Sequence, residues 1–495
     1  MSYLELLRLA APETIVVLTA LAVLTIDLTS MRGLETRLRF MVGGMLTCVG
    51  CLAAIVWMLV MPAYANMLQG MMVVDSLTQL VKICLLALTI FTVLISIESN
   101  FTNHVGEYLA LILLATVGMM FLVSAEDILM IFVSLELISL SLYVLAAFNK
   151  RDIKSAEAAL KYFLFGGMSA AFMLFGLSLL YGLSGSTNLA QIAAALAGKG
   201  LDPLLVVAIV MTVIGFGFKV AAVPFHLWAP DTYQGAPTPS AAFIASGSKL
   251  ASFFIFAKVM LIGFAGAEGS GAFRAYAAGW VPVIAIVAGL SMVLGNVVAI
   301  VQSSVKRLLA YSAIAHAGYM LLAVLSHDKQ AVASLIYYAV TYGLTTIGAF
   351  GVVAVVEDRA GDDKLSSFAG LSRRAPVVSL CMLIFMLSLA GIPPLAGFFG
   401  KFYVFAVAIK SGAPNLGLLW LVILAIAMSA VSLYYYLQVL KQVYVADAPA
   451  AAERVPVSWL TQTTLVLLAL GVLLFGCFPG WLVGLIERAM MQLTH

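Results

Sequence analysis

The stretch from Gly215 to Pro239 reads GFGFKVAAVPFHLWAPDTYQGAPTP, and the interpretation of the whole chain starts from it. The surrounding sequence is strongly apolar, yet this stretch carries Lys219, Pro224, His226 and Asp231 where a plain membrane helix has Leu or Val. Proline removes a backbone donor and clashes with the carbonyl four residues earlier. Backbone groups freed at membrane depth must meet buried protein or water. The stretch therefore predicts a broken membrane helix with a lysine beside a polar, hydrated pocket.

The composition is that of a polytopic helical membrane protein. The chain has 495 residues, of which 63% are hydrophobic and 10% charged, and its mean hydropathy is +1.10. Soluble domains carry about 25% charged residues. Apolar runs of about 20 residues, each long enough to cross a bilayer, recur throughout. We expect an all-α fold of fourteen spans, at 10–29, 40–60, 75–97, 107–124, 127–147, 156–182, 203–228, 238–263, 276–300, 306–325, 331–356, 377–409, 417–443 and 459–486.

The Lys and Arg residues between these spans predict the orientation. The side of the membrane with more of them faces the cytoplasm. One set of alternate loops holds Arg32, Arg37, Arg39, Lys150, Arg151, Lys154, Lys306, Arg307, Arg359, Lys364, Arg373, Arg374 and Arg454. The opposite loops hold only Arg8, Lys199, Arg274, Lys329, Lys410 and Arg488. We expect the first set in the cytoplasm and both chain ends outside. The net charge of +3 gives no indication of a nucleic-acid partner.

The cysteines do not predict a redox or metal site. Cys48 and Cys51 have a CxxC spacing, but they lie in an apolar run without further ligands nearby. Buried cysteine behaves as a small hydrophobe. The sequence offers no ligand set for an iron–sulfur cluster or haem and no GxGxxG after a strand. We therefore expect no cofactor and no metal in this chain.

Ionisable residues inside the predicted spans are the candidate functional residues, because they are expensive at membrane depth and usually functional. Lys219, Lys249 and Lys401 lie near span centres, and Glu136 lies in the middle of FVSLELISLSLY. Glu136 is the expected partner of Lys219, so that the lysine holds its proton when the glutamate is near and releases it otherwise. The alternative is a static buried ion pair. Lysines nearer span ends can reach the interface instead, and these are Lys82, Lys161 and Lys441.

Further candidates extend this set. His226, in the helix break, and His316, in AYSAIAHAGYM, can relay protons through either ring nitrogen. Lys161 either links the Lys219 pair to Lys249 or reaches the interface. The structural alternative for Lys249 is a lysine hydrogen-bonded only to Ser246 or Ser248. We expect Asp231 and Gln234 to cap the helices around the break. Lys258 is a weaker candidate than the other lysines. The arrangement predicts a proton wire, since neither a bulky substrate site nor a carboxylate cage for Na⁺ is visible.

A weak internal repeat organises the chain. ALKYFLFGGMSAA (159–171) is similar to SLIYYAVTYGLTT (334–346), and each precedes a span broken by proline, at Pro224 and at Pro393 and Pro394. We expect two five-span units, 107–263 and 276–443, after a three-helix segment at 1–106 and before a C-terminal helix at 444–495. An odd number of spans inverts the second unit relative to the first. Inverted repeats with broken helices mark transporter-type sites near the midplane.

Three segments resemble the antiporter-like membrane subunits of the proton-pumping NADH–quinone oxidoreductase (respiratory complex I), and among them the subunit N group. They are PFHLWAPDTYQGAPTPSAAFIASGSKL, SSVKRLLAYSAIAHAGY and LSLAGIPPLAGFFGKFYVF. The family's essential glutamate falls on Glu136, its paired lysine on Lys219 and its central lysine on Lys249. Lys401 falls where subunit N has a lysine and subunit M a glutamate.

The resemblance implies a translocase subunit in a bacterial inner membrane that pumps protons, driven by quinone reduction elsewhere. Flavin, iron–sulfur clusters and quinone are then expected in partner subunits. The expected partners are antiporter-like subunit M, the small subunits K and J, and lipid. Two alternatives remain at this point: an Mrp-type cation/proton antiporter or membrane hydrogenase subunit, and a scaffold that does not pump.

Overall fold

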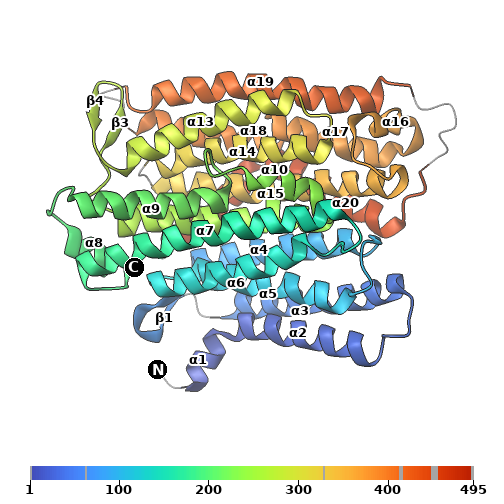
Figure 1. The fold of residues 1–495 in the computed structure, drawn as a ribbon, viewed down its shortest axis with the longest axis horizontal. Helices are drawn as coiled ribbons and strands as arrows, with labels where there is room; N and C mark the ends of the chain where they lie inside the picture. Colours follow the sequence, from blue (N-terminus) through green and yellow to red (C-terminus); the bar gives the residue numbers. More distant parts are fainter. Residues whose placement is uncertain (1–2, 62–63, 327–328, 412–415, 448–454, 492–495) are drawn as a thin grey trace.

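The computed structural model describes residues 3–61, 64–326, 329–411, 416–447 and 455–491. Arg454, one of the residues used to predict the orientation, lies outside them. The long helices run side by side along one direction, from the N-terminal α2 and α3 at the bottom of Figure 1 to α19 at the top. The predicted helical membrane fold is confirmed.

The N-terminal part packs against the first of the units predicted from the sequence. Its elements are α1 (Tyr3–Leu9), α2 (Ala11–Thr29), α3 (Thr36–Val60), β1 (Tyr64–Met67), η1 (Leu68–Gly70), β2 (Met72–Asp75) and α4 (Ser76–Ser96). The elements that follow are α5 (Val105–Ser124), α6 (Ile128–Ala146), α7 (Ile153–Ser184), α8 (Leu189–Leu196), α9 (Pro203–Val220), α10 (Trp228–Gly235), α11 (Thr238–Ala245), α12 (Gly247–Lys258) and η2 (Val259–Gly263).

The second half begins with a short hairpin. Its elements are β3 (Ser270–Ala272), β4 (Ala275–Ala277), α13 (Trp280–Ile300), α14 (Val305–Val324), α15 (Lys329–Ala360), η3 (Leu365–Phe368), α16 (Leu371–Arg374), α17 (Pro376–Ala390), α18 (Ala396–Lys410) and α19 (Leu419–Tyr444). The chain then forms α20 (Trp459–Cys477) and α21 (Pro479–Met491).

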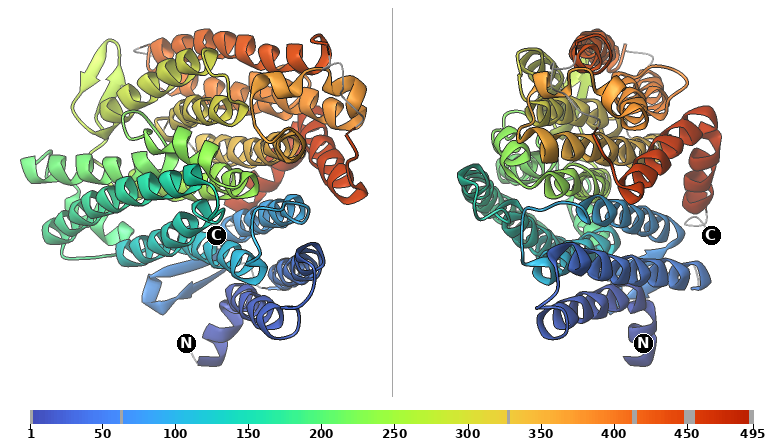
Figure 2. Two further views of the ribbon diagram at one scale, coloured as in Figure 1. Left: turned by 45° about the vertical axis from the view of Figure 1, so that its right-hand side comes forward. Right: turned by 90° about the vertical axis from the view of Figure 1, so that its right-hand side faces the viewer.

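Membrane-length helices match the predicted spans closely. In the described residues, thirteen helices are long and apolar enough to cross a membrane. The remaining predicted span, 377–409, is divided between α17 and α18. The prediction of one span at 459–486 was wrong in length, because α20 ends at Cys477 and Pro479 starts α21. Figure 2 shows α20 and α21 as a V at one side of the bundle.

The first predicted break lies between α9 and α10. Ala221 ends α9 in the left-handed conformation, with φ of 59°, and Pro224 lies in the turn that follows. Buried side chains satisfy the backbone groups that the break leaves free. The indole Nε1 of Trp228 donates to the Phe218 carbonyl at 3.0 Å, and the Val223 amide donates to Ser291 Oγ at 2.9 Å. Protein groups therefore satisfy these backbone groups, which lipid cannot do.

The second break has the same plan. Gly391 ends α17 with φ of 88°, and Pro393 and Pro394 follow before α18 begins. The Gly397 amide donates to Ser388 Oγ at 3.1 Å, which joins the two half-helices. A third interruption, not predicted from the sequence, lies at Ser246 between α11 and α12, where φ is −116° and ψ is −82°.

Two antiparallel hairpins, β1–β2 and β3–β4, interrupt the helical pattern among the described residues. Both hairpins lie at the left end of Figure 1 with α1 and α8, whereas α16 lies at the right end. The hairpins were not predicted, since their strands have only three or four residues. A continuous apolar core fills the space between the helices, and α14 and α15 carry much of it.

Candidate functional site

The first candidate site lies between α6 and α9. Lys219 stands in the last turn of α9, and its ammonium nitrogen donates a hydrogen bond to Ser139 Oγ on α6. Glu136 lies one turn earlier on α6 and interacts electrostatically with Lys219. The lysine does not hydrogen-bond to it, and Glu136 Oε1 is buried without a hydrogen-bond partner. The pair predicted from the sequence is therefore held apart in this structure.

The second site surrounds Lys249, in the first turn of α12. Lys249 is 3% exposed, and its Nζ donates to the carbonyl oxygen of Ala313 on α14 at 2.6 Å. The centre of the Tyr342 ring lies 5.7 Å from the same nitrogen, within the range of a cation–π interaction. The static alternative, a lysine held by Ser246 or Ser248, does not describe this geometry, because the hydrogen bond of Lys249 goes to Ala313 on another helix.

His316 lies at the centre of a buried group of tyrosines that we call the His316 cluster: His316, Tyr319, Tyr338, Tyr342 and Tyr436. His316 Nδ1 is 2.8 Å from Tyr338 Oη, and Nε2 is 3.2 Å from Tyr436 Oη. Its ring centre lies 5.0 Å from that of Tyr342 and 5.7 Å from that of Tyr319. Both ring nitrogens are thus engaged, and each hydroxyl can accept or donate a proton.

Polar side chains extend the cluster. Asn296 Nδ2 donates to Tyr319 Oη at 2.9 Å, and Tyr435 Oη donates to Asn296 Oδ1 at 3.0 Å. Tyr436 Oη and Ser312 Oγ also share a hydrogen bond. Two hydrogen-bonded sets of hydroxyl, amide and imidazole groups therefore lie in the otherwise apolar region between α13, α14, α15 and α19, and a ring contact between His316 and Tyr319 joins them.

Lys401 also lies beside this cluster. It is 4% exposed, and its Nζ lies 5.2 Å from the centre of the Tyr319 ring. It donates to the carbonyls of Leu389 and Ala390, each at 3.0 Å, and to Ser429 Oγ at 2.9 Å. The two carbonyls form the C-terminal end of α17, which carries a partial negative charge. Lys401 also lines a pocket of about 310 Å³ between α18 and α19.

The two breaks place their lysines differently. Lys219 precedes the first break, at the end of α9, whereas Lys401 follows the second break, on α18, and reaches back to α17. The two breaks therefore correspond, but their lysines lie on opposite half-helices.

His226 lies in the turn between α9 and α10. It is 7% exposed, and its Nδ1 is buried without a hydrogen-bond partner. The hydrogen bonds of the described residues do not connect it to Lys219. The structure thus places His226 in the break, as predicted from the sequence, without joining it to the lysine.

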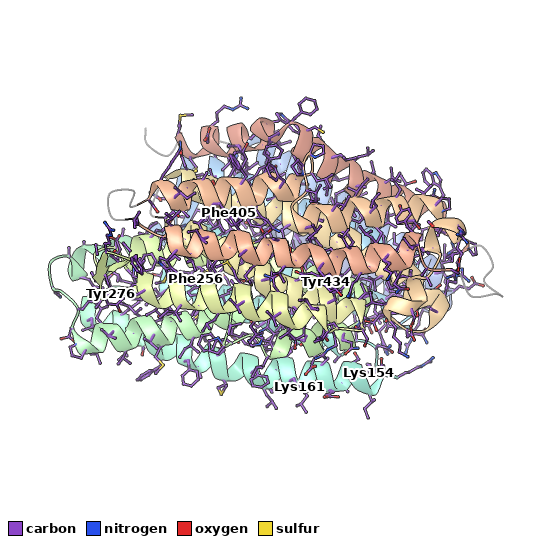
Figure 3. All side chains as sticks on the ribbon, turned by 90° about the horizontal axis from the view of Figure 1, so that it is seen from above. Lys154, Lys161, Phe256, Tyr276, Phe405 and Tyr434 are labelled. Carbon is purple, nitrogen blue, oxygen red and sulfur yellow. The ribbon has the colours of Figure 1, made fainter. Side chains whose placement is uncertain are left out.

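Lys161 belongs to a different network at the edge of the bundle. It pairs with Asp231 at 2.7 Å and with Glu157 at 2.6 Å, and Asp231 also binds Arg307 at 2.6 Å. Figure 3 shows Lys161 and Lys154 on α7 at the periphery. The structure does not bring Lys161 between Lys219 and Lys249. The helix-cap expectation for Asp231 and Gln234 was wrong, because Asp231 binds these cations and Gln234 accepts from Arg307 at 3.3 Å.

Three other lysines form ion pairs. Lys82 is 3% exposed and pairs with Glu13 at 2.6 Å, so the expectation that it reaches the interface was wrong. Lys258 pairs with Glu126 at 2.6 Å. Lys306, assigned to a loop from the sequence, lies in the first turn of α14, buried and paired with Glu357 at 2.7 Å.

The five cysteines are free thiols. In the part of the chain that the structure describes, no group of three or more His, Cys, Asp or Glu side chains could hold a metal ion.

Sequence reasoning missed residues that contact Lys219 or belong to the His316 cluster and its extension. Ser139 follows Glu136 by three residues, and this spacing places the two side chains on the same face of a helix. The run Tyr434–Tyr436 signals an unusual concentration of hydroxyls in one membrane helix, and only the structure shows two of them turned to Asn296 and His316.

Membrane-length helices, two breaks at proline and buried lysines beside polar clusters define the antiporter-like class of helical membrane proteins. The family model described as "NADH:quinone oxidoreductase/Mrp antiporter, TM" matches residues 125–429. The NADH-quinone oxidoreductase subunit N 2 of Acidobacterium capsulatum is 53% identical over 492 residues, covering 97% of this chain and 98% of that protein. The chain belongs to this family, and within it to the subunit N group.

Solved structures agree with that assignment. A chain of respiratory complex I from Thermus thermophilus is 33% identical with a TM-score of 0.78, over 96% of this chain and 98% of that one. A chain of the membrane-bound sulfane sulfur reductase, an archaeal respiratory membrane complex, has a TM-score of 0.83 at 23% identity, over 99% and 98%. The second likeness concerns the fold alone.

Proposed function

We propose that the chain is a proton-translocating membrane-arm subunit of a bacterial NADH–quinone oxidoreductase. One observation supports the site: Lys249 and Lys401 are both buried, and each lies beside a different tyrosine that contacts His316, Tyr342 for Lys249 and Tyr319 for Lys401. Charged side chains at membrane depth are costly and are retained where they move charge. The 53% identity to a named subunit N supports the assignment to this complex.

The surroundings of the lysines suit proton transfer. Lys219, Lys249 and Lys401 donate to serine hydroxyls and backbone carbonyls, which are neutral acceptors. A buried cation without a bonded carboxylate is held only weakly in its charged form. His316 can take a proton at one nitrogen and release one from the other, through its tyrosine partners. A proton can thus pass between Lys249 and Lys401 with small side-chain movements.

The proposal includes the remaining candidates in named roles. Glu136 controls the proton on Lys219 at the first site, and His226, buried in the break, is a proton relay. Lys161 stays outside this path, in the edge network with Asp231 and Glu157.

We also propose that 107–263 and 276–443 are inverted repeats, flanked by segments 1–106 and 444–495. Both units contain a 32-residue helix, α7 or α15, a short distance ahead of the half-helix that ends at the break. In both, the half-helix before the break ends in a left-handed residue a few positions before proline. With this plan the chain ends face the outer side of the inner membrane.

The partners follow from the proposed complex. Antiporter-like subunit M and the small subunits K and J would contact the exposed apolar faces of the bundle together with lipid. Flavin, iron–sulfur clusters and quinone would be held by other subunits, and their chemistry would drive this one. Purification of the tagged chain in mild detergent is expected to recover flavin and iron–sulfur proteins. Recovery of Mrp-type or hydrogenase partners instead would overturn the assignment.

The site is tested by Lys219→Ala in the native complex. Assembly is measured on native gels, and NADH oxidation and proton uptake are measured in inverted membrane vesicles. We expect normal assembly with strongly reduced pumping. Unchanged pumping and turnover in a fully assembled complex would contradict the proposal and favour a scaffold role.

A further inference from the structure

The acceptor of Lys219 in this structure is not the carboxylate expected to control it. Resting on the proposed function, we propose that Ser139 is a positioning residue, which provides a second acceptor for the Lys219 ammonium. The lysine alternates between Glu136 and Ser139. Contact with Ser139 defines the separated state of the pair, in which the proton on Lys219 is free to leave.

The spacing on α6 permits this alternation. Glu136 and Ser139 are three residues apart in one helix, so their side chains lie on the same face about 5–6 Å apart. A lysine side chain has four rotatable bonds, and Lys219 approaches this face from α9. Rotation of its terminal bonds therefore moves the ammonium from one residue to the other without a shift of either helix.

The hydrogen bonding of Ser139 fixes the direction of the contact. Its hydroxyl proton is donated to the carbonyl of Leu135, four residues earlier on α6. A hydroxyl has only one proton, so towards Lys219 the Ser139 oxygen acts as an acceptor. Ser139 is 2% exposed. Because it is buried, water does not readily take its place as the acceptor for Lys219.

Glu136 shows the other half of the alternation. Its Oε1 is buried and has no hydrogen-bond partner. A buried carboxylate oxygen without a donor is rare, because the missing bond costs free energy. Lys219 is the cation whose charge interacts with Glu136. Glu136 Oε1 and Ser139 Oγ are therefore the two acceptors between which the Lys219 ammonium moves.

Another polar side chain lies beside Ser139. Tyr143 lies one turn beyond Ser139 on the same face of α6, and its hydroxyl is buried without a hydrogen-bond partner. Gly166 on α7 leaves the space for that hydroxyl, since a Cβ there would collide with it. The surroundings of the Lys219 ammonium at Ser139 are therefore not purely apolar, because the Tyr143 hydroxyl lies on the same face of α6.

Three variants of the complete oxidoreductase complex test this role. Ser139→Ala removes the second acceptor, Ser139→Thr keeps a hydroxyl that can bond to the same carbonyl, and Ser141→Ala is the matched control. Ser141 makes the same type of bond, to the Leu137 carbonyl at 2.9 Å, but does not contact Lys219. Native gels measure assembly, and inverted vesicles measure NADH oxidation and proton uptake.

We expect Ser139→Ala to assemble normally and to pump about tenfold more slowly, the factor that corresponds to losing one hydrogen bond to a charged group. Ser139→Thr and Ser141→Ala are expected to pump like the wild type. An experimental structure of the assembled Ser139→Ala complex should show Lys219 bonded to Glu136. A purely structural role of Ser139 would not move the lysine.

Two results would overturn the inference. One is wild-type pumping by an assembled Ser139→Ala complex, and the other is an equal loss in Ser139→Thr and Ser139→Ala despite full assembly. Lys219→Ala distinguishes a failure of the proposed function from a failure of the Ser139 role alone. If it pumps normally, the proposed function fails; if it is impaired while Ser139→Ala is normal, only the role of Ser139 fails.

Discussion

The ammonium nitrogen of Lys249 lies 2.6 Å from the carbonyl oxygen of Ala313, a backbone atom of α14. Ala313 stands one turn before His316 on the same helix. The lysine on α12 is therefore fixed against the helix that carries the centre of the His316 cluster. This contact joins the first half of the chain to the second at the point where a proton would cross between them.

Replacing Lys249 with Ala is expected to stop this crossing. Removal of a proton-transfer group lowers rates by about 10²–10⁴-fold, so NADH-driven proton uptake in vesicles should fall at least about a hundredfold. Lys441→Ala is the matched control, because Lys441 is exposed on α19. Equal pumping by the two variants would show that Lys249 has no part in the path.

His316→Phe tests the cluster itself. Phenylalanine keeps a ring among the tyrosines but removes the bonds to Tyr338 and Tyr436. Pumping should slow, and the complex should lose about 1–3 kcal/mol of stability because buried hydroxyls lose a partner. Thermal unfolding of the purified complex measures the second effect.

Tyr338→Phe in the His316→Phe background is the control for stability. It removes the hydroxyl that the first substitution leaves without its imidazole partner, so part of the lost thermal stability should return while pumping stays slow. Recovery of both would mean that the cluster serves packing alone.

The buried pair Glu13–Lys82 lies on α2 and α4, away from the three lysine sites, and both side chains are 3% exposed. Lys82→Met alone leaves a buried carboxylate and should cost about 3–5 kcal/mol. The double variant Glu13→Leu with Lys82→Met should recover most of that loss, since apolar replacements of buried pairs are often neutral. Thermal unfolding measures stability, and vesicle assays should show wild-type pumping in the double variant. Lost pumping in a stable double variant would make this pair part of the proton path.

Much of the fold could be predicted from the sequence, because membrane-length apolar runs and prolines are local signals. The C-terminal ends of α3 and α13, at Val60 and Ile300, follow from such runs, and the two breaks follow from the prolines. The hairpins could not be predicted, since strands of three or four residues leave little pattern. The end of α20 was missed because Pro479 was read as part of one long span.

The candidate site was predictable in its charges but not in its contacts. A lysine in an apolar run is visible in sequence, whatever it touches. Its partners come from distant helices, as Lys249 shows with Ala313 and Lys82 with Glu13. These partners depend on tertiary packing, which one sequence does not report. For the same reason Ser139 and the tyrosines around His316 appeared only with the structure.

Gly397→Ala tests whether the second break positions Lys401. Gly397 opens α18, and a Cβ there would collide with the backbone carbonyl of Ser388 near the end of α17. Since backbone cannot turn aside as a side chain can, the half-helices must separate. Lys401, one turn further on, would then lose its bonds to the Leu389 and Ala390 carbonyls. We expect reduced pumping and a loss of about 1–3 kcal/mol in stability, typical of overpacking.

Gly167→Ala is the matched control for this variant, because Gly167 on α7 has no neighbouring atom within 4 Å of an added Cβ. Alanine there should leave pumping unchanged and raise stability slightly, as alanine favours helices over glycine by about 1 kcal/mol. Thermal unfolding and proton uptake are measured on both variants in the assembled complex. If Gly397→Ala matched Gly167→Ala in both measurements, the close contact of the half-helices would not hold Lys401 in place. A defect in Gly397→Ala alone would show that the geometry of the break, and not only the charge of the lysine, sets the rate of proton transfer.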